Sequence, residues 1–274
     1  MGSTVKIALV SLDQRWLGKE QNFVRCAEFT HKAAAQGCEL VIFPEMTLTG
    51  YSLDMKAVAE PEQESLTLSR FGALAKNAGL SIVYGVCLIE HSSSRPRNQF
   101  CLARPDGVSN AIYAKMHPFS FAGEDKVLQA GTQIVTAKVG MLEFGASICY
   151  DLRFPELYSA MALTCNAAIA IANWPAKRVA HWRALLVARA IENQFYMFGV
   201  NRIGSDGNGL VYEKSTVVVS PDGLLLKPVV QGEEMDIFDI NLEDAARYRA
   251  EFPTVRDKRY PLYRKFFGDL IDVE

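Results

Sequence analysis

The arrangement that decides the fold is clearest in residues 146–156, which read ASICYDLRFPE. An apolar, strand-like run ends at Cys149, a polar turn follows, and a helix is expected over residues 155–163. A thiol at the end of a strand can act as a nucleophile. Most free cysteines are small buried side chains, so this segment alone does not establish chemistry.

Two other apolar runs end in the same way. Residues 40–51 (LVIFPEMTLTGY) are interrupted by Pro44 and deliver Glu45, and residues 111–119 (AIYAKMHPF) deliver Lys115. Three predicted strand ends therefore carry a glutamate, a lysine and a cysteine.

The chain as a whole alternates strands and helices, and this order recurs in both halves. Two such halves predict an α/β fold with two mixed sheets packed face to face and helices outside. We find no linker between the halves and expect one domain over residues 1–274, with an extended C-terminal tail from about residue 248. The predicted strands are 5–12, 40–43, 81–90, 98–103, 111–114, 134–139, 141–148, 167–172, 196–202, 216–220 and 224–228.

The three strand-end motifs, in this order, resemble those of the nitrilase superfamily of carbon–nitrogen hydrolases over about residues 5–239. The resemblance implies a four-layer αββα sandwich. It also assigns Glu45 as general base, Lys115 as oxyanion partner and Cys149 as nucleophile. Glu124, ahead of a Leu-x-x-Gly turn, fits a further family glutamate that positions Lys115 or the substrate; the alternative is a solvated carboxylate at a helix start.

These residue types suit amide hydrolysis. An amide is a poor electrophile, so the reaction needs a strong nucleophile and a group that stabilises the charge on oxygen. A thiol requires a base or a nearby positive charge for activation. Glu45 can serve as base in both half-reactions, while Lys115 and the backbone N–H of Tyr150 hold the oxyanion. The structural alternative for Glu45 and Lys115 is a buried ion pair, which seldom stabilises more than apolar packing does.

Two other hypotheses remain open from the sequence. A Cys-His dyad could use His117, two residues beyond Lys115, or His181, although both histidines also have plain structural interpretations. A binding scaffold without catalytic activity is the hypothesis from a different class. The intact glutamate, lysine and cysteine argue against it.

Residues 173–182 (NWPAKRVAHW), 188–194 (ARAIENQ) and 201–209 (NRIGSDGNG) are most similar to the bacterial ω-amidase branch. That resemblance implies hydrolysis of 2-oxoglutaramate, succinamate or related monoamides of dicarboxylic acids, with release of ammonia. An amidase for deaminated glutathione, or another amidase of the superfamily, is the alternative within the family.

A substrate of this kind carries a free carboxylate at the end opposite its amide. A guanidinium or ammonium group suits that carboxylate. The candidates are Arg178, Lys177 and Arg202, of which Arg202 could instead brace its own loop. Trp174 and Tyr150 are expected to form walls of the substrate pocket, or else to be core aromatics.

The composition excludes several classes of function. The chain has 274 residues, of which 49% are hydrophobic and 22% charged, and its net charge of -2 gives no reason to expect a nucleic acid or a membrane as partner. No apolar run could span a bilayer and no signal-peptide layout is seen, so we expect a cytoplasmic protein. The family resemblance implies a homodimer. The six cysteines are expected to be reduced thiols, and no motif for a metal or cofactor is present.

Overall fold

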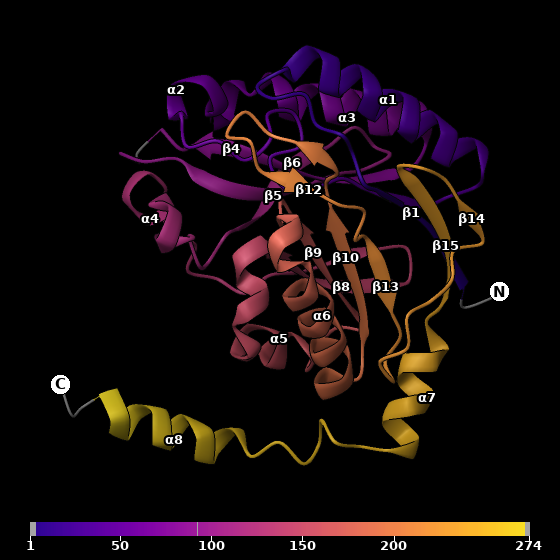
Figure 1. The fold of residues 1–274 in the computed structure, drawn as a ribbon. Coiled ribbons are helices and arrows are strands. Elements are labelled where there is room, and N and C mark those ends of the chain that lie inside the picture. The colour runs from indigo at the N-terminus through magenta and orange to yellow at the C-terminus, as the bar shows by residue number, and fades with distance from the viewer. Residues whose placement is uncertain (1–3, 92, 272–274) are drawn as a thin grey trace.

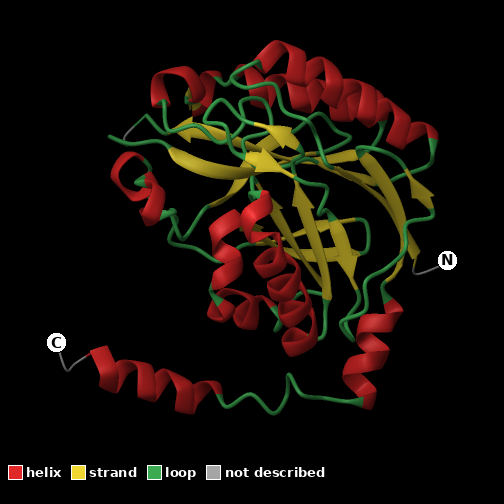
Figure 2. Ribbon diagram, viewed as in Figure 1, coloured by secondary structure: helices red, strands yellow, loops and turns green. Residues whose placement is uncertain are grey.

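Two β-sheets lie face to face in the computed structural model, which describes residues 4–91 and 93–271 (Figure 1). Helices α1 (Lys19–Ala35) and α3 (Leu66–Ala78) cover the outer face of one sheet. Helices α5 (Pro155–Met161) and α6 (Val179–Asn193) cover the outer face of the other. Figure 2 shows the resulting order of helix, sheet, sheet and helix, which confirms the predicted αββα class.

The first sheet has eight strands in the order β14-β15-β1-β2-β4-β5-β6, and β3 pairs with β4. It is mixed, because β1, β2 and β4 are parallel neighbours while β5 runs antiparallel to β4 and β6. The strands are β1 (Thr4–Val10), β2 (Leu40–Ile42), β3 (Glu60–Pro61), β4 (Ser81–Ile89), β5 (Arg97–Ala103), β6 (Ser109–Ala114), β14 (Val230–Gln231) and β15 (Met235–Asn241).

The second sheet has five strands in the order β13-β10-β9-β8-β7. Its three central strands are parallel, and both outer strands pair antiparallel to their neighbours. The strands are β7 (Thr136–Val139), β8 (Leu142–Ile148), β9 (Ala167–Ala172), β10 (Tyr196–Asn201) and β13 (Val217–Val219). A short hairpin of β11 (Gly204–Ser205) and β12 (Val211–Tyr212) lies outside both sheets.

The strands are buried on both faces because each sheet packs against the other sheet and against helices. In β1, Ile7 and Leu9 belong to the core between the sheets, whereas Ala8 and Val10 pack with the helix layer. This alternation is the two-residue period of a strand. It explains why these strands read as continuous apolar runs.

The parallel strands also place the residues that follow them at one edge. Strands β1, β2, β4 and β6 all point in one direction, as do β8, β9 and β10 in the second sheet. Ligand sites of open α/β sheets form beyond the carboxyl ends of such strands. The loops after β2, β6, β8 and β9 are therefore where a site is expected.

Four further helices and four 3₁₀ turns complete the described chain. The segment from residue 248 is not extended throughout, as the sequence suggested, because it ends α7 and later forms the aromatic-rich helix α8. No described helix combines the length and apolar character needed to cross a membrane. The remaining elements are α2 (Met55–Val58), α4 (Glu124–Val127), α7 (Glu243–Glu251), α8 (Tyr260–Ile271), η1 (Glu62–Glu64), η2 (Ser120–Ala122), η3 (Cys149–Arg153) and η4 (Ala176–Arg178).

Most predicted strands are present, but the strand predicted over residues 224–228 is wrong. That segment contributes only an isolated bridge between Val219 and Leu225. The sequence reasoning also missed β15, which pairs along its whole length with β1. The homodimer prediction concerns a second copy of the chain and stays a prediction.

Candidate active site

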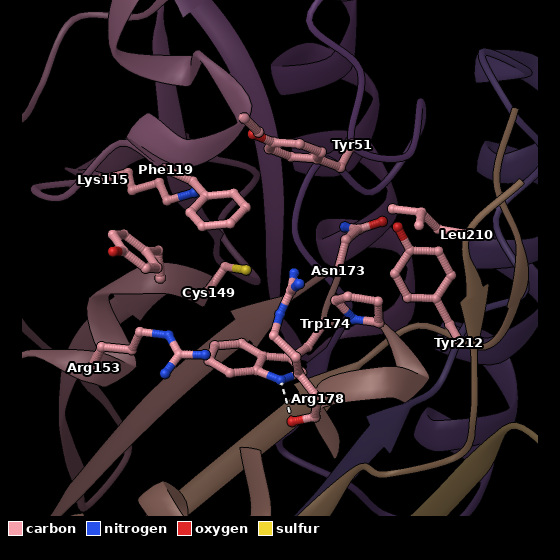
Figure 3. A pocket seen from close by; sticks show the side chains of 13 residues that line it. Tyr51, Lys115, Phe119, Cys149, Arg153, Asn173, Trp174, Arg178, Leu210 and Tyr212 are labelled. Atoms are coloured by element: carbon pink, nitrogen blue, oxygen red, sulfur yellow. Dashed lines mark hydrogen bonds between the residues drawn. The ribbon is translucent and has the colours of Figure 1, made fainter. Parts of the chain in front are cut away.

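Three strand ends bring Glu45, Lys115 and Cys149 together, as the sequence motifs predicted. Glu45 lies just beyond β2, Lys115 directly follows β6, and Cys149 directly follows β8 in the facing sheet. The site therefore forms between the two sheets at their carboxyl edge. Lys115 and Cys149 both line one pocket there (Figure 3).

The ammonium of Lys115 lies between two buried carboxylates. Its Nζ is 3.2 Å from Oε1 of Glu45 and 3.0 and 2.7 Å from the two carboxylate oxygens of Glu124. Burial opposes a charge on Lys115, but the carboxylates of Glu124 and Glu45 outweigh it and raise the pKa of Lys115 well above its usual value. The lysine is therefore a fixed cation at neutral pH.

Glu124 is fully buried, so the alternative of a solvated carboxylate at a helix start is wrong. Its Oε2 accepts a hydrogen bond of 2.6 Å from the backbone N–H of Phe119 and one of 3.3 Å from the hydroxyl of Tyr51. With both oxygens occupied by donors, Glu124 holds Lys115 rather than facing solvent.

The carboxylate of Glu45 is fixed from two sides by residues that the sequence analysis did not assign. Oε1 accepts 2.7 Å from the side-chain amide of Asn98, and Oε2 accepts 2.9 Å from the backbone N–H of Asn173. The Asn173 side chain also donates 2.7 Å to the backbone carbonyl of Glu45. Asn173 begins the stretch that resembles the ω-amidase branch, but nothing local in the sequence indicates that it or Asn98 contacts Glu45.

The turn that carries Glu45 has an unusual backbone. Met46 has a φ of 45°, in the left-handed region that few residues other than glycine adopt. The turn lies directly on β4, where a Cβ added to Gly85 would come within 2.5 Å of the Met46 nitrogen. Thr47 ties the two together, since its hydroxyl accepts 2.9 Å from the Gly85 N–H.

Cys149 begins the 3₁₀ turn η3 and also has a left-handed backbone, with a φ of 49°. Burial and the adjacent Glu45 carboxylate raise the pKa of the thiol well above its usual value, while Lys115 and the N–H of Asn173 act in the opposite direction. The resting sulfur is therefore a thiol rather than a thiolate. The Asn173 N–H faces both the sulfur and Glu45 Oε2, which places the Glu45 carboxylate and the thiol beside the same donor.

Asp151 holds the cysteine turn, a role that the sequence analysis missed. One oxygen of this fully buried carboxylate accepts 2.9 Å from the Ile148 N–H and 2.7 Å from the Tyr113 hydroxyl. The other accepts 3.0 Å from the His117 N–H. Asp151 therefore connects the strand end that carries Cys149 to the one that carries Lys115.

The two histidines of the alternative dyad have other contacts. His117 Nδ1 is 2.8 Å from Asp151, and its ring stacks on Phe154 with centroids 3.7 Å apart. His181 Nδ1 is 3.4 Å from the guanidinium of Arg153. The contacts of these two rings are thus with Asp151, Phe154 and Arg153. This geometry favours the glutamate–lysine–cysteine arrangement over a Cys-His dyad.

The pocket beside Cys149 has a volume of about 100 Å³, and five of its thirteen lining residues are aromatic. The predicted wall residues Tyr150 and Trp174 both line it. Tyr150 packs against Phe119 with centroids 4.8 Å apart, and the Trp174 indole donates 2.8 Å to the Arg178 carbonyl, the dashed line in Figure 3. Tyr212 also lines the pocket. The size suits a small organic substrate.

Of the cations predicted to bind a carboxylate, only Arg178 lines the pocket. Figure 3 shows its guanidinium directed into the cavity, with Arg153, which the sequence analysis did not single out, beside the Trp174 indole. Among the described residues, neither arginine has a carboxylate within ion-pair distance. Lys177 is exposed outside the pocket, and Arg202 is fully buried behind it.

The described part of the chain has no group of three or more His, Cys, Asp or Glu side chains placed to hold a metal ion. The site thus contains one thiol, two carboxylates, the ammonium that both carboxylates hold, and two arginines at the pocket wall.

Comparisons with known proteins agree with this geometry. A carbon–nitrogen hydrolase family model matches residues 6–250. The omega-amidase YafV of Yersinia enterocolitica is 32% identical over 256 residues, which are 93% of this chain and 97% of that protein. The 2-oxoglutaramate amidase of Bacillus subtilis (strain 168) is 29% identical, over 90% of this chain and 95% of that one.

A solved structure shares the same fold. XC1258 from Xanthomonas campestris, a CN-hydrolase superfamily protein with an arsenic adduct in its active site, matches with a TM-score of 0.85 and 28% identity. The match covers 93% of this chain and 97% of that one. Together these matches confirm the predicted resemblance to the nitrilase superfamily and its ω-amidase branch.

We predict that Lys115→Met lowers the free energy of unfolding by about 3–5 kcal/mol, because it leaves two carboxylates buried without their cation. Urea unfolding followed by fluorescence measures the loss. Because folding raises the pKa of Lys115, its contribution to stability is fully present at pH values below its pKa in the unfolded chain. The contribution fades only as the pH rises through its pKa in the folded protein. The stability that Lys115 contributes to the wild type should therefore stay constant between about pH 7 and pH 9.

Lys6→Met is the matched control, since Lys6 forms an exposed pair with Asp239 at 3.9 Å. It should change the unfolding free energy by at most about 0.5 kcal/mol. A loss for Lys115→Met as small as that of the control would contradict the closed charge cluster.

Proposed function

The chain belongs to the carbon–nitrogen hydrolase family, whose members act on carbon–nitrogen bonds other than peptide bonds, and on that premise we propose its substrate and mechanism. We propose that it hydrolyses the terminal amide of a small monoamide of a dicarboxylic acid, such as 2-oxoglutaramate or succinamate. A thioester on Cys149 is the intermediate, and ammonia is released. The supporting observation is the buried pair of Glu45 and Lys115 beside the partly exposed Cys149. These three residues lie at one end of a pocket whose wall carries Arg178, which has no carboxylate partner among the described residues.

The first half-reaction begins from a protonated thiol, because burial keeps the pKa of Cys149 raised. As the sulfur attacks the amide carbon, Glu45 takes the thiol proton through an oxygen beside the shared Asn173 N–H. The carbonyl electron pair moves onto oxygen, where the Lys115 ammonium and the Tyr150 N–H stabilise the negative charge. Losing one such donor typically costs about 3–4 kcal/mol of barrier.

The intermediate collapses when Glu45 passes its proton to the amide nitrogen. The carbon–nitrogen bond breaks, ammonia leaves, and the acyl group remains as a thioester on Cys149. Glu45 then removes a proton from water, which attacks the thioester, and the proton returns to sulfur as the carboxylic acid departs. One carboxylate serves both halves, so its orientation must be the same in each.

Glu124 and Asn98 act on this chemistry through other groups. Glu124 binds Lys115 with both oxygens, and Asn98 donates to Glu45 at 2.7 Å and to Glu124 at 3.4 Å. These contacts keep the ammonium from forming a tight two-point pair with Glu45. The base is then left available for the proton of Cys149.

The far end of the substrate is recognised by charge. Arg178 lines the pocket, lies 5.6 Å from the Phe119 ring centroid, and has no carboxylate partner among the described residues. A substrate carboxylate would supply that partner through charge-assisted hydrogen bonds. Arg153 is a second cation on the same wall, whereas Lys177 lies outside it.

The proposed reaction is tested by ammonia release across 2-oxoglutaramate, succinamate, deaminated glutathione, an N-carbamoyl amino acid and a simple nitrile. The two short monoamides should have the highest kcat/KM. Cys149→Ser and Glu45→Gln should lower it by roughly a thousandfold or more, while His181→Gln keeps most of the activity. Rapid-quench mass spectrometry should find the acyl adduct on Cys149.

Three results would contradict the proposal. A fully active Cys149→Ser enzyme would exclude the thioester, and a His181→Gln variant as impaired as Glu45→Gln would favour a histidine base. A highest kcat/KM for deaminated glutathione would assign the alternative substrate.

We predict that Arg178→Met lowers kcat/KM for 2-oxoglutaramate by roughly 10- to 100-fold, because a charge-assisted hydrogen bond contributes about 1.5–3 kcal/mol. For a neutral amide of similar length the value should change little, since that substrate has no partner for the guanidinium. Lys177→Met is the matched control and should behave as wild type on both. An equal fall for both substrates would mean that Arg178 supports only the pocket wall.

A further inference from the structure

Arg202 is a buried cation just outside the pocket. It follows β10 directly, and its side chain has no exposed surface. Its Nε donates 3.0 Å to the Ile203 carbonyl, and its Nη2 donates 3.0 Å each to the carbonyls of Gln14 and Ser205. The nearest acidic oxygen in an ion pair is that of Asp13, at 3.8 Å.

Gln14 extends this contact to the catalytic turn. It is buried, and its side-chain amide nitrogen lies 3.0, 3.0 and 3.1 Å from the carbonyls of Glu45, Met46 and Thr47. Those carbonyls belong to the turn in which Met46 has a left-handed backbone. Gln14 follows β1, so one amide from the end of a parallel strand holds a strained turn in place.

Asn201, the residue before Arg202, holds the second backbone segment that contacts Glu45. Its Oδ1 accepts 2.7 Å from the Trp174 N–H, and its Nδ2 donates 2.8 Å to the Trp174 carbonyl. Trp174 follows Asn173, whose backbone N–H and side-chain amide both bind Glu45. Two adjacent residues of one strand end thus fix the two backbone segments that meet at the Glu45 carboxylate.

This arrangement is expensive if stability is its sole purpose. Burying a guanidinium with mainly carbonyl partners carries a desolvation penalty, and apolar packing is often as stable. One nitrogen of the group, Nη1, is buried without a hydrogen-bond partner. The desolvation penalty is explained if the rigid guanidinium of Arg202 is needed to fix the positions of the backbone carbonyls that it binds.

We infer that Arg202, together with Gln14 and Asn201, is a positioning element that sets the orientation of the Glu45 carboxylate toward Cys149. The inference rests on the proposed function, in which Glu45 transfers protons to and from the same sulfur in both half-reactions. Arg202 acts from behind the pocket: the ring of Tyr212, which lines it, has its centroid 4.6 Å from the guanidinium carbon. Binding of the substrate carboxylate is therefore assigned to Arg178 and not to Arg202.

The test compares Arg202→Met, Arg202→Lys and Gln14→Leu with wild type and with Arg249→Met. Arg249 is a matched control, because its guanidinium also binds three backbone carbonyls, those of Gln194, Cys165 and Asn193. Those carbonyls lie at the opposite end of β9 from the site. Activity is normalised to the folded fraction of each variant, measured by urea unfolding, so that a misfolded fraction does not count.

Arg202→Met and Gln14→Leu should lower kcat by roughly 10- to 100-fold on both 2-oxoglutaramate and a neutral amide, with little change in KM, because a small misplacement of a catalytic group has effects of this size. Arg202→Lys should recover part of the loss. Arg249→Met should lower the melting temperature and leave kcat unchanged. A fall confined to the carboxylate substrate would overturn the inference, since Arg202 would then bind substrate.

The second readout does not require turnover. The pH profile for alkylation of Cys149 by iodoacetamide, followed by mass spectrometry, reports on the coupling of thiol and base. Arg202→Met and Gln14→Leu should each move this pH profile in the same direction as Glu45→Gln does. A profile like that of wild type, in a variant that folds, overturns the inference. If wild type hydrolyses no amide in the panel, the proposed function fails, while the alkylation profiles still decide whether Arg202 and Gln14 act on Glu45.

Discussion

The structure of the site depends on the buried contact between Lys115 and the carboxylates of Glu45 and Glu124. Two negative groups and one positive group are all nearly inaccessible to water. Such a cluster is stable only if its remaining acceptors find donors. That requirement accounts for the donors around the cluster, which include the Asn98 amide and the backbone N–H groups of Asn173 and Phe119. These donors come from the ends of strands in both sheets, so the cluster can form only where those strand ends meet at one edge.

Strain in two turns is a second constraint, and it is met by the same means. Met46 and Cys149 both have left-handed backbones, which cost of order 1–3 kcal/mol each and persist only when the surroundings fix them. Gln14 fixes the first turn through three carbonyls, and Asp151 fixes the second through the Ile148 N–H. The turns that carry Glu45 and Cys149 are thus held by the polar side chains of Gln14 and Asp151.

The sequence predicted the groups proposed to react, and Glu124 beside Lys115, but not the other residues that hold them. Glu45, Lys115 and Cys149 could be found because each ends an apolar run, a pattern local to a few residues. Asn98 and Asp151 could not, since a polar residue near a strand end has many uses and its partners lie 53 and 38 positions away. The same limit explains why β15 was missed: its pairing partner β1 is at the other end of the chain.

The distribution of charge along the pocket also bears on how a substrate binds. The cluster around Lys115 has two carboxylates for one ammonium, so the catalytic end has an excess negative charge, while Arg178 and Arg153 make the wall positive. A monoamide with one free carboxylate can bind in two directions. Placing the carboxylate beside Glu45 sets like charges against one another in a site of low dielectric, whereas placing it against Arg178 pairs opposite charges. The second direction puts the uncharged amide at Cys149. Electrostatics alone would then orient the substrate before any contact with its carbon chain is made.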